Sequence, residues 1–485
     1  MTTEYVDVLI VGAGISGIGA AYHLMDQCPD RSFAIVEARD SIGGTWDLFR
    51  YPGIRSDSDM FTLGYSFKPW TREKTIASGE TIMSYLEETV DEFGIGSHIR
   101  FGQRVTKASW STLEERWTVS IMNAEDRATE MTCGLLYMCA GYYSYKGGHR
   151  PYFANEEEFA GPIIHPQQWP EDLDYAAKRV AIIGSGATAM TLVPTMAKTA
   201  EHVTLVQRSP SYVLARPSVD PVNTQLRRIM SDGAASSITR AKNIRLTALL
   251  YNKTRTDPDK IRAMLLKGAR DVLDDPTLVD QHFSPSYSPW DQRLCLLPDG
   301  DLFEAINDST ASMVTDTVER FTSTGLQMAS GEHVDADIII TATGLNVVTL
   351  GEADIVVDGT AVDFGATWTY KGFAYSDVPN LLSSFGYVNA SWTLGSELTN
   401  VYACRLLNHM RETGTSVATP RLRPGDHDMV ARPWIDDFSA NYLARVMDKM
   451  PRQGDREPWL NTQDYLKDRT FIGKAPIDDG VMTFT

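Results

Sequence analysis

The chain has 485 residues, of which 43% are hydrophobic, and a formal net charge of −18 at pH 7. This length exceeds one ordinary hydrophobic core and predicts two or three domains, and the acidic balance argues against nucleic acid or an anionic membrane as a partner, because both attract basic surfaces. No apolar run reaches membrane-spanning length and no basic flank precedes an apolar stretch near Met1, so we expect a cytoplasmic protein without stable membrane insertion.

The first predicted elements are a buried strand, a glycine-rich turn and a helix. Residues 6–11 form a short apolar run, Gly12, Gly14 and Gly17 follow with GxGxxG spacing, and residues 18–25 continue as a helix. A second strand over 33–36 ends at Glu37, where a carboxylate can accept hydrogen bonds from a ribose diol while a pyrophosphate rests on the helix N-terminus. This order predicts a dinucleotide-binding unit.

A second unit of the same kind follows, with one informative change. A strand over 180–183, a helix through about residue 197 and a strand over 203–207 surround a second turn, whose residues are Gly184, Ser185, Gly186, Ala187 and Thr188. The last strand ends in Arg208 and Ser209 instead of an acid, and a guanidinium with a hydroxyl can hold a 2′-phosphate. We therefore expect FAD at the first turn and NADPH at the second, although Arg208 could also be a solvated loop charge.

The pattern of strands and helices that the sequence predicts between and after these units indicates an α/β fold of two Rossmann-like domains, with a helical insertion in the NADPH domain. Three consecutive isoleucines, Ile338 to Ile340, suit a fully buried strand, and Gly344 allows a tight turn or a close approach to a ligand. The expected segments are 1–145 and 345–485 for the FAD-binding domain, 146–177 for a linker, 178–213 and 291–344 for the NADPH-binding domain, and 214–290 for the insertion.

Within the insertion, the clearest helix begins with Asp257 as N-cap and Pro258 in the first turn. One apolar face is expected to comprise Ile261, Met264, Leu265 and Val272, and the run stops at Asp274-Asp275-Pro276. Periodicity shows only that one face is buried, so the insertion either covers a pocket or is a passive structural element.

The cysteines and histidines suggest neither redox nor metal chemistry. Five cysteines are scattered without a CxxC pair, which predicts buried thiols and no redox-active disulfide. Nine histidines form no zinc-like cluster, so we expect no metal site.

The expected linker contains the pattern F-x-G-x-x-x-H-x-x-x-W-P, made by Phe159, Gly161, His165, Trp169 and Pro170. With both glycine turns and the Ala-Thr-Gly end of the isoleucine strand, this motif makes the chain resemble the type I Baeyer–Villiger monooxygenases, which are class B flavoprotein monooxygenases. The segments 43–46, 50–59, 289–295 and 389–394 resemble the ethionamide-activating branch in particular. The resemblance runs from about residue 5 to residue 475.

The resemblance implies roles for individual residues. Arg293 matches the arginine that stabilises the negatively charged flavin peroxide, and Asp57 matches the aspartate that tunes it. Without the resemblance, a surface ion pair for Arg293 and a loop cap for Asp57 would be the favoured explanations, because neither residue stands out in its local sequence. The motif around His165 is implied to support motion between the domains. Gln292 stands where better-known members often have a lysine that binds the 2′-phosphate, which leaves the preference for NADPH over NADH open. The implied FAD-site residues are Gly12, Gly14, Gly17, Glu37, Gly44, Thr45, Trp46, Asp57, Val105 and Ala140, and the implied NADP-site residues are Gly184, Ser185, Gly186, Ala187, Thr188, Arg208, Ser209 and Arg293.

The implied activity depends on NADPH and O2. A C4a-peroxyflavin would insert one oxygen atom next to a ketone carbonyl to give an ester or lactone, and the same oxidant could act on sulfides or thioamides. Three alternatives remain at this stage: an N- or S-oxygenating flavin-containing monooxygenase, an NADPH oxidase that releases hydrogen peroxide, and a non-catalytic NADPH-sensing protein. The expected small-molecule partners are O2 and a small organic ketone or sulfide; nucleic acid is not expected, and the oligomeric state is left open.

Overall fold

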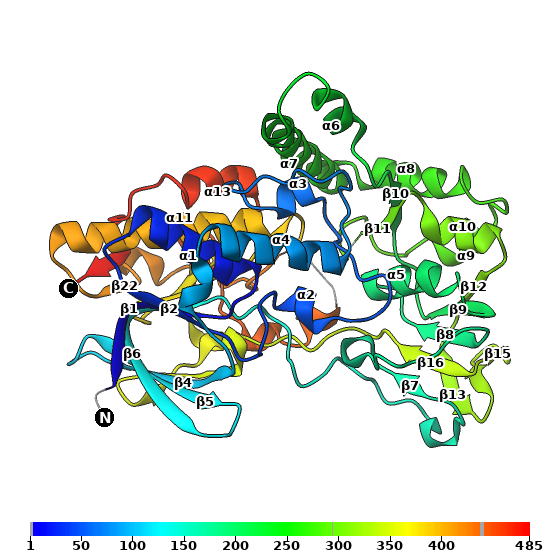
Figure 1. Ribbon diagram of the computed structural model, residues 1–485, viewed down its shortest axis with the longest axis horizontal. Helices are drawn as coiled ribbons and strands as arrows, with labels where there is room; N and C mark the ends of the chain where they lie inside the picture. The colour runs from blue at the N-terminus through cyan, green and yellow to red at the C-terminus, as the bar shows by residue number, and fades with distance from the viewer. Residues whose placement is uncertain (1–2, 293, 437–440) are drawn as a thin grey trace.

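The computed structural model describes residues 3–292, 294–436 and 441–485, which are organised around two sheets (Figure 1). The larger sheet has nine strands. In spatial order they are β18 (Thr360–Ala361), β17 (Asp354–Val357), β4 (Gln103–Ser111), β5 (Arg116–Asn123), β6 (Ala128–Met138), β1 (Glu4–Val11), β2 (Phe33–Val36) and β3 (Ile99–Arg100), with β21 (Leu381–Ser383) beside β6. The smaller sheet has the order β12 (Ala311–Thr315), β9 (His202–Gln207), β8 (Arg179–Ile183), β16 (Ile338–Thr341) and β7 (Ile163–Ile164).

The centre of the larger sheet is apolar on both faces. Val8, Leu9 and Ile10 of β1 are fully buried, as expected for a parallel strand that is covered on both sides, and β1 pairs in parallel with β2 and β6. One face packs against α1 (Ile15–Gln27), α4 (Gly79–Glu92) and α11 (Trp392–Thr413). On the other face, side chains of β1 and β2 share a core with side chains of β4 and β5 from the same sheet, and Trp110 and Trp117 fill that core.

The smaller sheet is entirely parallel, and its strands β8, β9 and β16 are ones that the apolar runs predict. Ile338, Ile339 and Ile340 of β16 are buried between β8 and β7. Helices α5 (Ala187–Met196), α9 (Leu278–His282) and α10 (Asp301–Asn307) pack on it, and β13 (Val318–Thr322), β14 (Gly325–Met328) and β15 (His333–Asp335) form a separate antiparallel sheet. Ile163 and Ile164, which were expected in a linker, form the edge strand β7, because two adjacent apolar residues extend the parallel ladder of β16.

The chain passes from the larger sheet to the smaller one and back. After β16 it returns to add β17, β18 and β21 to the larger sheet. The remaining elements around that sheet are α2 (Thr45–Leu48), α3 (Met60–Leu63), α12 (Asn441–Ala444), α13 (Tyr465–Phe471), β19 (Thr369–Tyr370), β20 (Ala374–Tyr375), β22 (Ala418–Pro420) and β23 (Met482–Phe484). The α/β fold with two Rossmann-like units and a helical insertion is confirmed.

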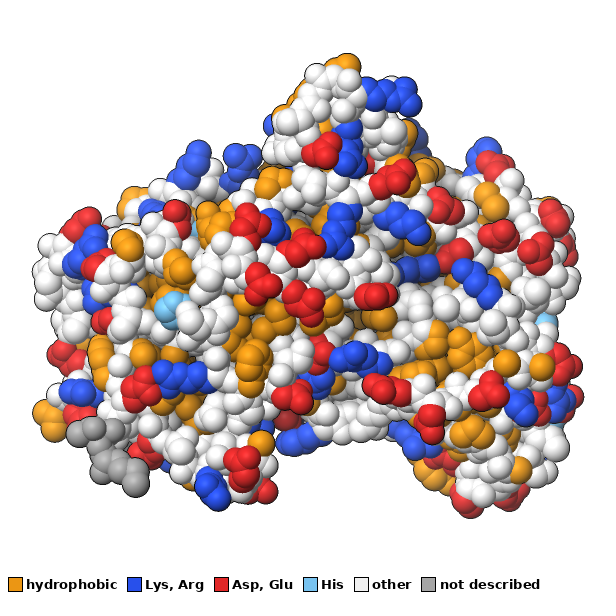
Figure 2. Space-filling view, in the orientation of Figure 1, with side chains coloured by type: hydrophobic (Ala, Val, Ile, Leu, Met, Phe, Trp, Pro, Cys, Tyr) orange, Lys and Arg blue, Asp and Glu red, His pale blue; other side chains and the backbone are white. Residues whose placement is uncertain are grey.

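The insertion consists of β10 (Val213–Arg216), which pairs with β11 (Cys295–Pro298), and of α6 (Pro221–Leu226), α7 (Asp232–Thr256) and α8 (Pro258–Arg270). Helices α6 and α7 stand out from the body as a green lobe at the top of the view, whereas α8 lies against the body (Figure 1; Figure 2). Asp257 and Pro258 begin α8 as predicted. The expected apolar face was too wide: Met264 and Val272 are 47% and 44% exposed. Helix α8 ends at Arg270 and buries only the narrower i, i+4, i+8 row of Ile261, Leu265 and Ala269.

None of the helices in the described part of the chain is long and apolar enough to cross a membrane. All five cysteines are buried, as predicted.

Candidate active site

The first glycine-rich turn joins β1 to α1 at a place where side chains do not fit. Gly12 has φ +107°, and a Cβ on it would lie 2.6 Å from the carbonyl oxygen of Cys139, just after β6. A Cβ on Gly17 would lie 1.9 Å from the carbonyl oxygen of Gly12. The turn is therefore pressed between a strand end and its own helix, and bare backbone at the N-terminus of α1 faces the adjoining cavity. Such a helix start binds the pyrophosphate of a dinucleotide.

Glu37, at the end of β2, is tied to this turn. One carboxylate oxygen accepts a hydrogen bond from the Ala13 amide at 2.7 Å, and the other accepts one from the Arg39 amide at 2.9 Å. Burial raises the pKa of Glu37, although these amides and the Arg39 charge act in the opposite direction. Two of the roughly four lone-pair positions of the carboxylate are used by these amides, so it can still accept a hydrogen bond from a ribose diol in the cavity that it lines.

The segment after β2 folds back over the first turn. The Gly43 amide donates to the Ala13 carbonyl at 3.0 Å. Gly14 lies so close to Gly44 that a Cβ on Gly14 would be 3.6 Å from the Cα of Gly44. An ion pair between Arg39 and the buried Asp47 holds α2 in place. Thr45 and Trp46 consequently line the cavity beside the glycine turn.

The second glycine-rich turn repeats the geometry of the first between β8 and α5. Gly184 has φ +145°, and a Cβ on it would lie 2.3 Å from the Ala342 carbonyl oxygen after β16. Gly186 has open space around its Cα and lines the cavity together with Ala187 and Thr188. In the flanking loop of the larger sheet, burial raises the pKa of Tyr51 to about 12, and its hydrogen bond to Thr188 joins the two units.

The linker motif is fixed to the end of β16. His165 Nε2 lies 3.1 Å from the Gly344 carbonyl oxygen, and His165 Nδ1 accepts a hydrogen bond from the Gln167 amide at 3.2 Å. Burial lowers the pKa of His165, so the ring is neutral near pH 7 and donates through Nε2. A Cβ on Gly161 would lie 2.1 Å from the Asp337 carbonyl oxygen, which explains the glycine.

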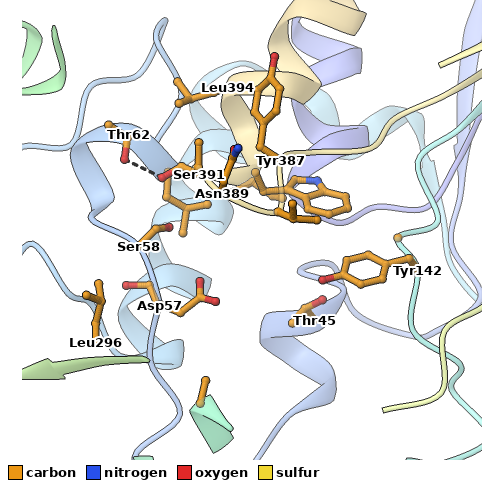
Figure 3. Close-up of a pocket in the computed structure, with 18 of the residues that line it drawn as sticks. Thr45, Asp57, Ser58, Thr62, Tyr142, Leu296, Tyr387, Asn389, Ser391 and Leu394 are labelled. Carbon is orange, nitrogen blue, oxygen red and sulfur yellow. Dashed lines mark hydrogen bonds between the residues drawn. The ribbon is translucent and has the colours of Figure 1, made fainter. Parts of the chain in front are cut away.

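Both turns open into one cavity of about 700 Å³. Figure 3 shows Asp57, Thr45 and Tyr142 around the same space, although they come from different segments. Ser391 Oγ and Thr62 Oγ1, which line the cavity on the side of Asp57, are 2.6 Å apart. The cavity also reaches Trp290, Leu294 and Leu296, so the sequence on either side of position 293 contributes to the wall.

Helix α7 of the insertion forms another wall and is clamped to the larger unit by polar contacts. Arg240 donates to the carbonyl oxygens of residues 61, 62 and 64 at 2.9, 3.2 and 2.6 Å, and its other nitrogen lies 2.9 Å from Glu397. Asn243 donates to Asp59, the N-cap of α3, at 2.9 Å. Ile244, Thr247 and Tyr251 line the cavity. The insertion thus covers the pocket, the functional one of the two interpretations that the sequence allowed.

Two family models match parts of the chain: a flavin-binding monooxygenase-like model over residues 64–240 and an NAD(P)-binding Rossmann-like model over residues 10–71. The FAD-containing monooxygenase EthA of Mycobacterium tuberculosis is 49% identical over 483 residues, which cover 99% of this chain and 98% of the relative. The probable FAD-binding monooxygenase AlmA of Acinetobacter baylyi is 46% identical, with 99% and 96% covered. The chain belongs to the FAD-containing monooxygenases of the EthA type.

Solved structures agree with this assignment. An oxidised steroid monooxygenase bound to NADP superposes with a TM-score of 0.78 and 25% identity over 99% of both chains. A cyclohexanone monooxygenase from Rhodococcus sp. Phi1 bound to NADP+ shares the fold, with a TM-score of 0.73 and 21% identity over 87% of both chains. The protein is an FAD-containing, NADPH-dependent monooxygenase that uses O2, as the sequence predicted.

The structure brings most of the predicted site residues of the monooxygenase together. Those that line the cavity are Gly12, Gly14, Glu37, Gly44, Thr45, Trp46, Asp57, Ala140, Gly186, Ala187 and Thr188. The described residues Gly17, Val105, Gly184, Ser185, Arg208 and Ser209 do not line it. The side chain of Val105 packs in the core of the larger sheet, so only its backbone is available to a cofactor. Arg293 lies outside the described residues, and its role stays a prediction.

Other residues of the cavity could not be recognised as site residues from the sequence. Arg255 at the end of α7 donates to Asp291 at 2.8 Å and to the Pro289 carbonyl oxygen at 2.6 Å, and so holds the turn that precedes position 293. Tyr142 stacks on Trp392 with ring centroids 5.2 Å apart. These residues come together only through long-range packing; the single hint was that the resembling segment 389–394 contains Trp392.

Proposed function

We propose that this monooxygenase converts a small ketone into an ester or lactone. One atom of O2 is inserted between the carbonyl carbon and a neighbouring carbon, the other leaves as water, and NADPH with one proton supplies the two electrons. The observation that carries the proposal is a shared cavity, which joins both glycine turns to Asp57 and to the flanks of position 293. A steroid monooxygenase and a cyclohexanone monooxygenase among the similar structures support it.

The residues around the turns fit the two cofactors. FAD would lie along Gly12 and Gly14, with its ribose at Glu37 and its ring system beyond Thr45 and Trp46; NADPH would lie at Gly186 and Thr188. Bound FAD supplies the oxygen-transfer chemistry, and bound NADPH supplies the electrons. Arg208 and Ser209 are exposed at the end of β9, where they can meet a 2′-phosphate.

Arg293 and Asp57 are the residues that we assign to charge stabilisation. Negative charge develops on oxygen as the ketone carbonyl is attacked, and an arginine supplies a permanent cation in a site that excludes water. Support comes from Asp57, which lines the cavity, and from Trp290 and Leu294, which flank the arginine in sequence and line the same cavity. Asp57 would offset the cost of desolvating the cation.

The remaining wall residues are suited to excluding water. The hydroxyl oxygens of Tyr142 and Tyr143 are 2.6 Å apart, and Trp392 Nε1 donates to Ser16 Oγ at 2.8 Å. Because these polar groups satisfy one another, they leave mainly aromatic surface for an organic substrate and few groups that hold water.

The test is a reaction of FAD-loaded enzyme with NADPH, O2 and phenylacetone, with products identified by mass and with NADPH and hydrogen peroxide followed in parallel. The expected product is an ester. Arg293→Ala should abolish it while NADPH still reduces the flavin. Arg262→Ala is the matched control, since Arg262 donates to Ser284 at 3.5 Å and does not line the described cavity. Ester formation by Arg293→Ala would refute the role of that residue. Peroxide without ester, or sulfoxide as the only oxygenated product when a thioether is added, would refute the ketone assignment.

A further inference from the structure

The insertion carries a charge opposite to that of the whole chain. Residues 221–270, which span α6 to α8, contain eleven Lys or Arg and only three acids, all Asp, so this segment has a net charge of +8 in a chain whose total is −18. The expectation that an acidic protein avoids anionic surfaces rests on the total and does not apply to this lobe. Figure 2 shows basic and hydrophobic side chains on the lobe that protrudes at the top.

Several of these cations are not neutralised by the protein. Six of the eleven form ion pairs, for example Arg240 with Glu397 and Lys242 with Asp220. The other five have no acidic partner among the described residues; they are Arg228, Arg245, Lys253, Lys260 and Arg262. Unpaired cations on a protein surface leave a positive potential that reaches into solvent by about a Debye length, roughly 8 Å at physiological salt.

Helix α7 interleaves unpaired cations with exposed aliphatic residues along one stripe. Ile238, Leu246 and Leu249 are 47%, 52% and 55% exposed, and with Arg245 and Lys253 they follow the i, i+3, i+4 spacing of one helix face. We call these five residues the outer stripe. Ile229, in the turn between α6 and α7, is 78% exposed and extends the apolar character toward the tip.

The opposite face of the same helix belongs to the cavity. Ile244, Thr247 and Tyr251 line it, and the Arg240 and Asn243 contacts hold this face against the body. The outer stripe therefore needs no further partner within the chain to fold, and its apolar side chains are displayed by a helix that is already fixed.

We propose that the outer stripe of α7, with the tip at Ile229, docks on the surface of a bilayer that contains anionic lipid. Aliphatic side chains flanked by Lys and Arg on a surface helix enter the headgroup region while the cations meet lipid phosphates. Nucleic acid fits less well, because its phosphates offer nothing to Leu246 and Leu249. A second copy fits less well too, because a basic lobe against an acidic body makes a heterologous contact and not the self-complementary contact of the common two-fold dimer.

The test uses FAD-loaded enzyme and flotation with two kinds of vesicle: phosphatidylcholine alone, and a mixture in which about a third of the lipid is phosphatidylglycerol. Wild type should float with the anionic vesicles only, and added salt should weaken binding. Arg245→Gln/Lys253→Gln should lower the partition coefficient about 25-fold, roughly fivefold for each charge. Leu246→Ser/Leu249→Ser should lower the partition coefficient at low salt and at high salt, since salt does not screen the burial of apolar side chains.

Matched controls lie on the β4–β5 side of the molecule, away from the lobe in Figure 1. Arg104→Gln/Lys107→Gln removes the same charge from exposed positions of β4, and Leu113→Ser alters a leucine that is 95% exposed; neither should change binding. Equal flotation with both vesicles, no flotation of wild type, or an equal loss in the controls would overturn the proposal. Concentration-dependent assembly that only the outer-stripe variants abolish, without vesicle binding, would also overturn it and identify a contact between copies.

Discussion

Replacing Arg240 with methionine should loosen α7 from the body of the monooxygenase. The ion pair that Arg240 forms with Glu397 is nearly buried, with side-chain exposures of 13% and 11%. Removing one partner of such a pair leaves an uncompensated charge and costs about 3–5 kcal/mol. The carbonyl oxygens of residues 61, 62 and 64 also lose a donor. We therefore expect about 3 kcal/mol of local destabilisation at pH 8.

The cost should depend on pH with a defined sign. Burial already raises the pKa of Glu397, while Arg240 acts against that shift. Without the arginine the folded-state pKa rises further above the unfolded value, so the folded variant keeps a proton that the unfolded chain releases. Its stability is then greatest at low pH and falls as the pH rises through the folded pKa. Arg240→Met should approach wild type at acidic pH and depart from it at pH 8.

Hydrogen exchange of the α7 amides measures this directly. A loss of about 3 kcal/mol corresponds to local opening that is roughly 150-fold more frequent, since 1.36 kcal/mol is a factor of ten. Glu397→Gln combined with Arg240→Met should recover much of the loss, because no charge is then left buried. Arg245→Met, five residues further along the same helix on its exposed side, is the control and should leave exchange unchanged. A coupling energy below about 0.5 kcal/mol in the double-mutant cycle would refute the reasoning.

Three further predictions address other parts of the molecule. Burial raises the pKa of Asp468 to about 6, so the free energy of unfolding falls as pH rises from about 4 to 6. Asp468→Asn should remove this slope and raise the free energy of unfolding in urea at pH 8 by up to about 3 kcal/mol. A lower stability of the variant at pH 8 would contradict this prediction. Gly12→Ala places a Cβ 2.6 Å from the Cys139 carbonyl oxygen at φ +107° and should give enzyme depleted of FAD by absorbance, whereas Gly268→Ala, with nothing within 4 Å, should retain it. Arg208→Ala should raise KM for NADPH about 10-fold or more and leave KM for NADH nearly unchanged; equal changes for both would show that Arg208 is only a solvated charge.

The strands and turns were predictable because their signals are local. β2 was expected over 33–36, where the structure has it, and β1, β8, β9 and β16 lie within a few residues of their expected positions. A buried parallel strand requires a continuous apolar run, and a phosphate-binding turn requires glycines next to it. Glu37 could be chosen because it ends a strand at the usual distance from the glycines.

Residues that reach the site through tertiary packing could not be found in this way. The apolar pattern of α8 suggested that Met264 was buried, but the helix buries only Ile261, Leu265 and Ala269, and Met264 stays exposed. Arg255 looks like an ordinary cation at the end of a helix, yet it holds the turn at Asp291. The local sequence does not predict that Arg240 pairs with Glu397, which lies 157 positions further along the chain.

The sequence by itself determined the order of the two dinucleotide-binding units, the linker motif and the family, because each depends on residue types at short, fixed spacing. Only the tertiary structure decided that both turns open into one cavity, that α7 closes it, and that the outer stripe of α7 remains exposed. The physical reason is that burial and ion pairing depend on contacts between segments hundreds of residues apart, such as Arg55 with Asp301. Short-range patterns can specify an element, but they do not specify which surface it meets.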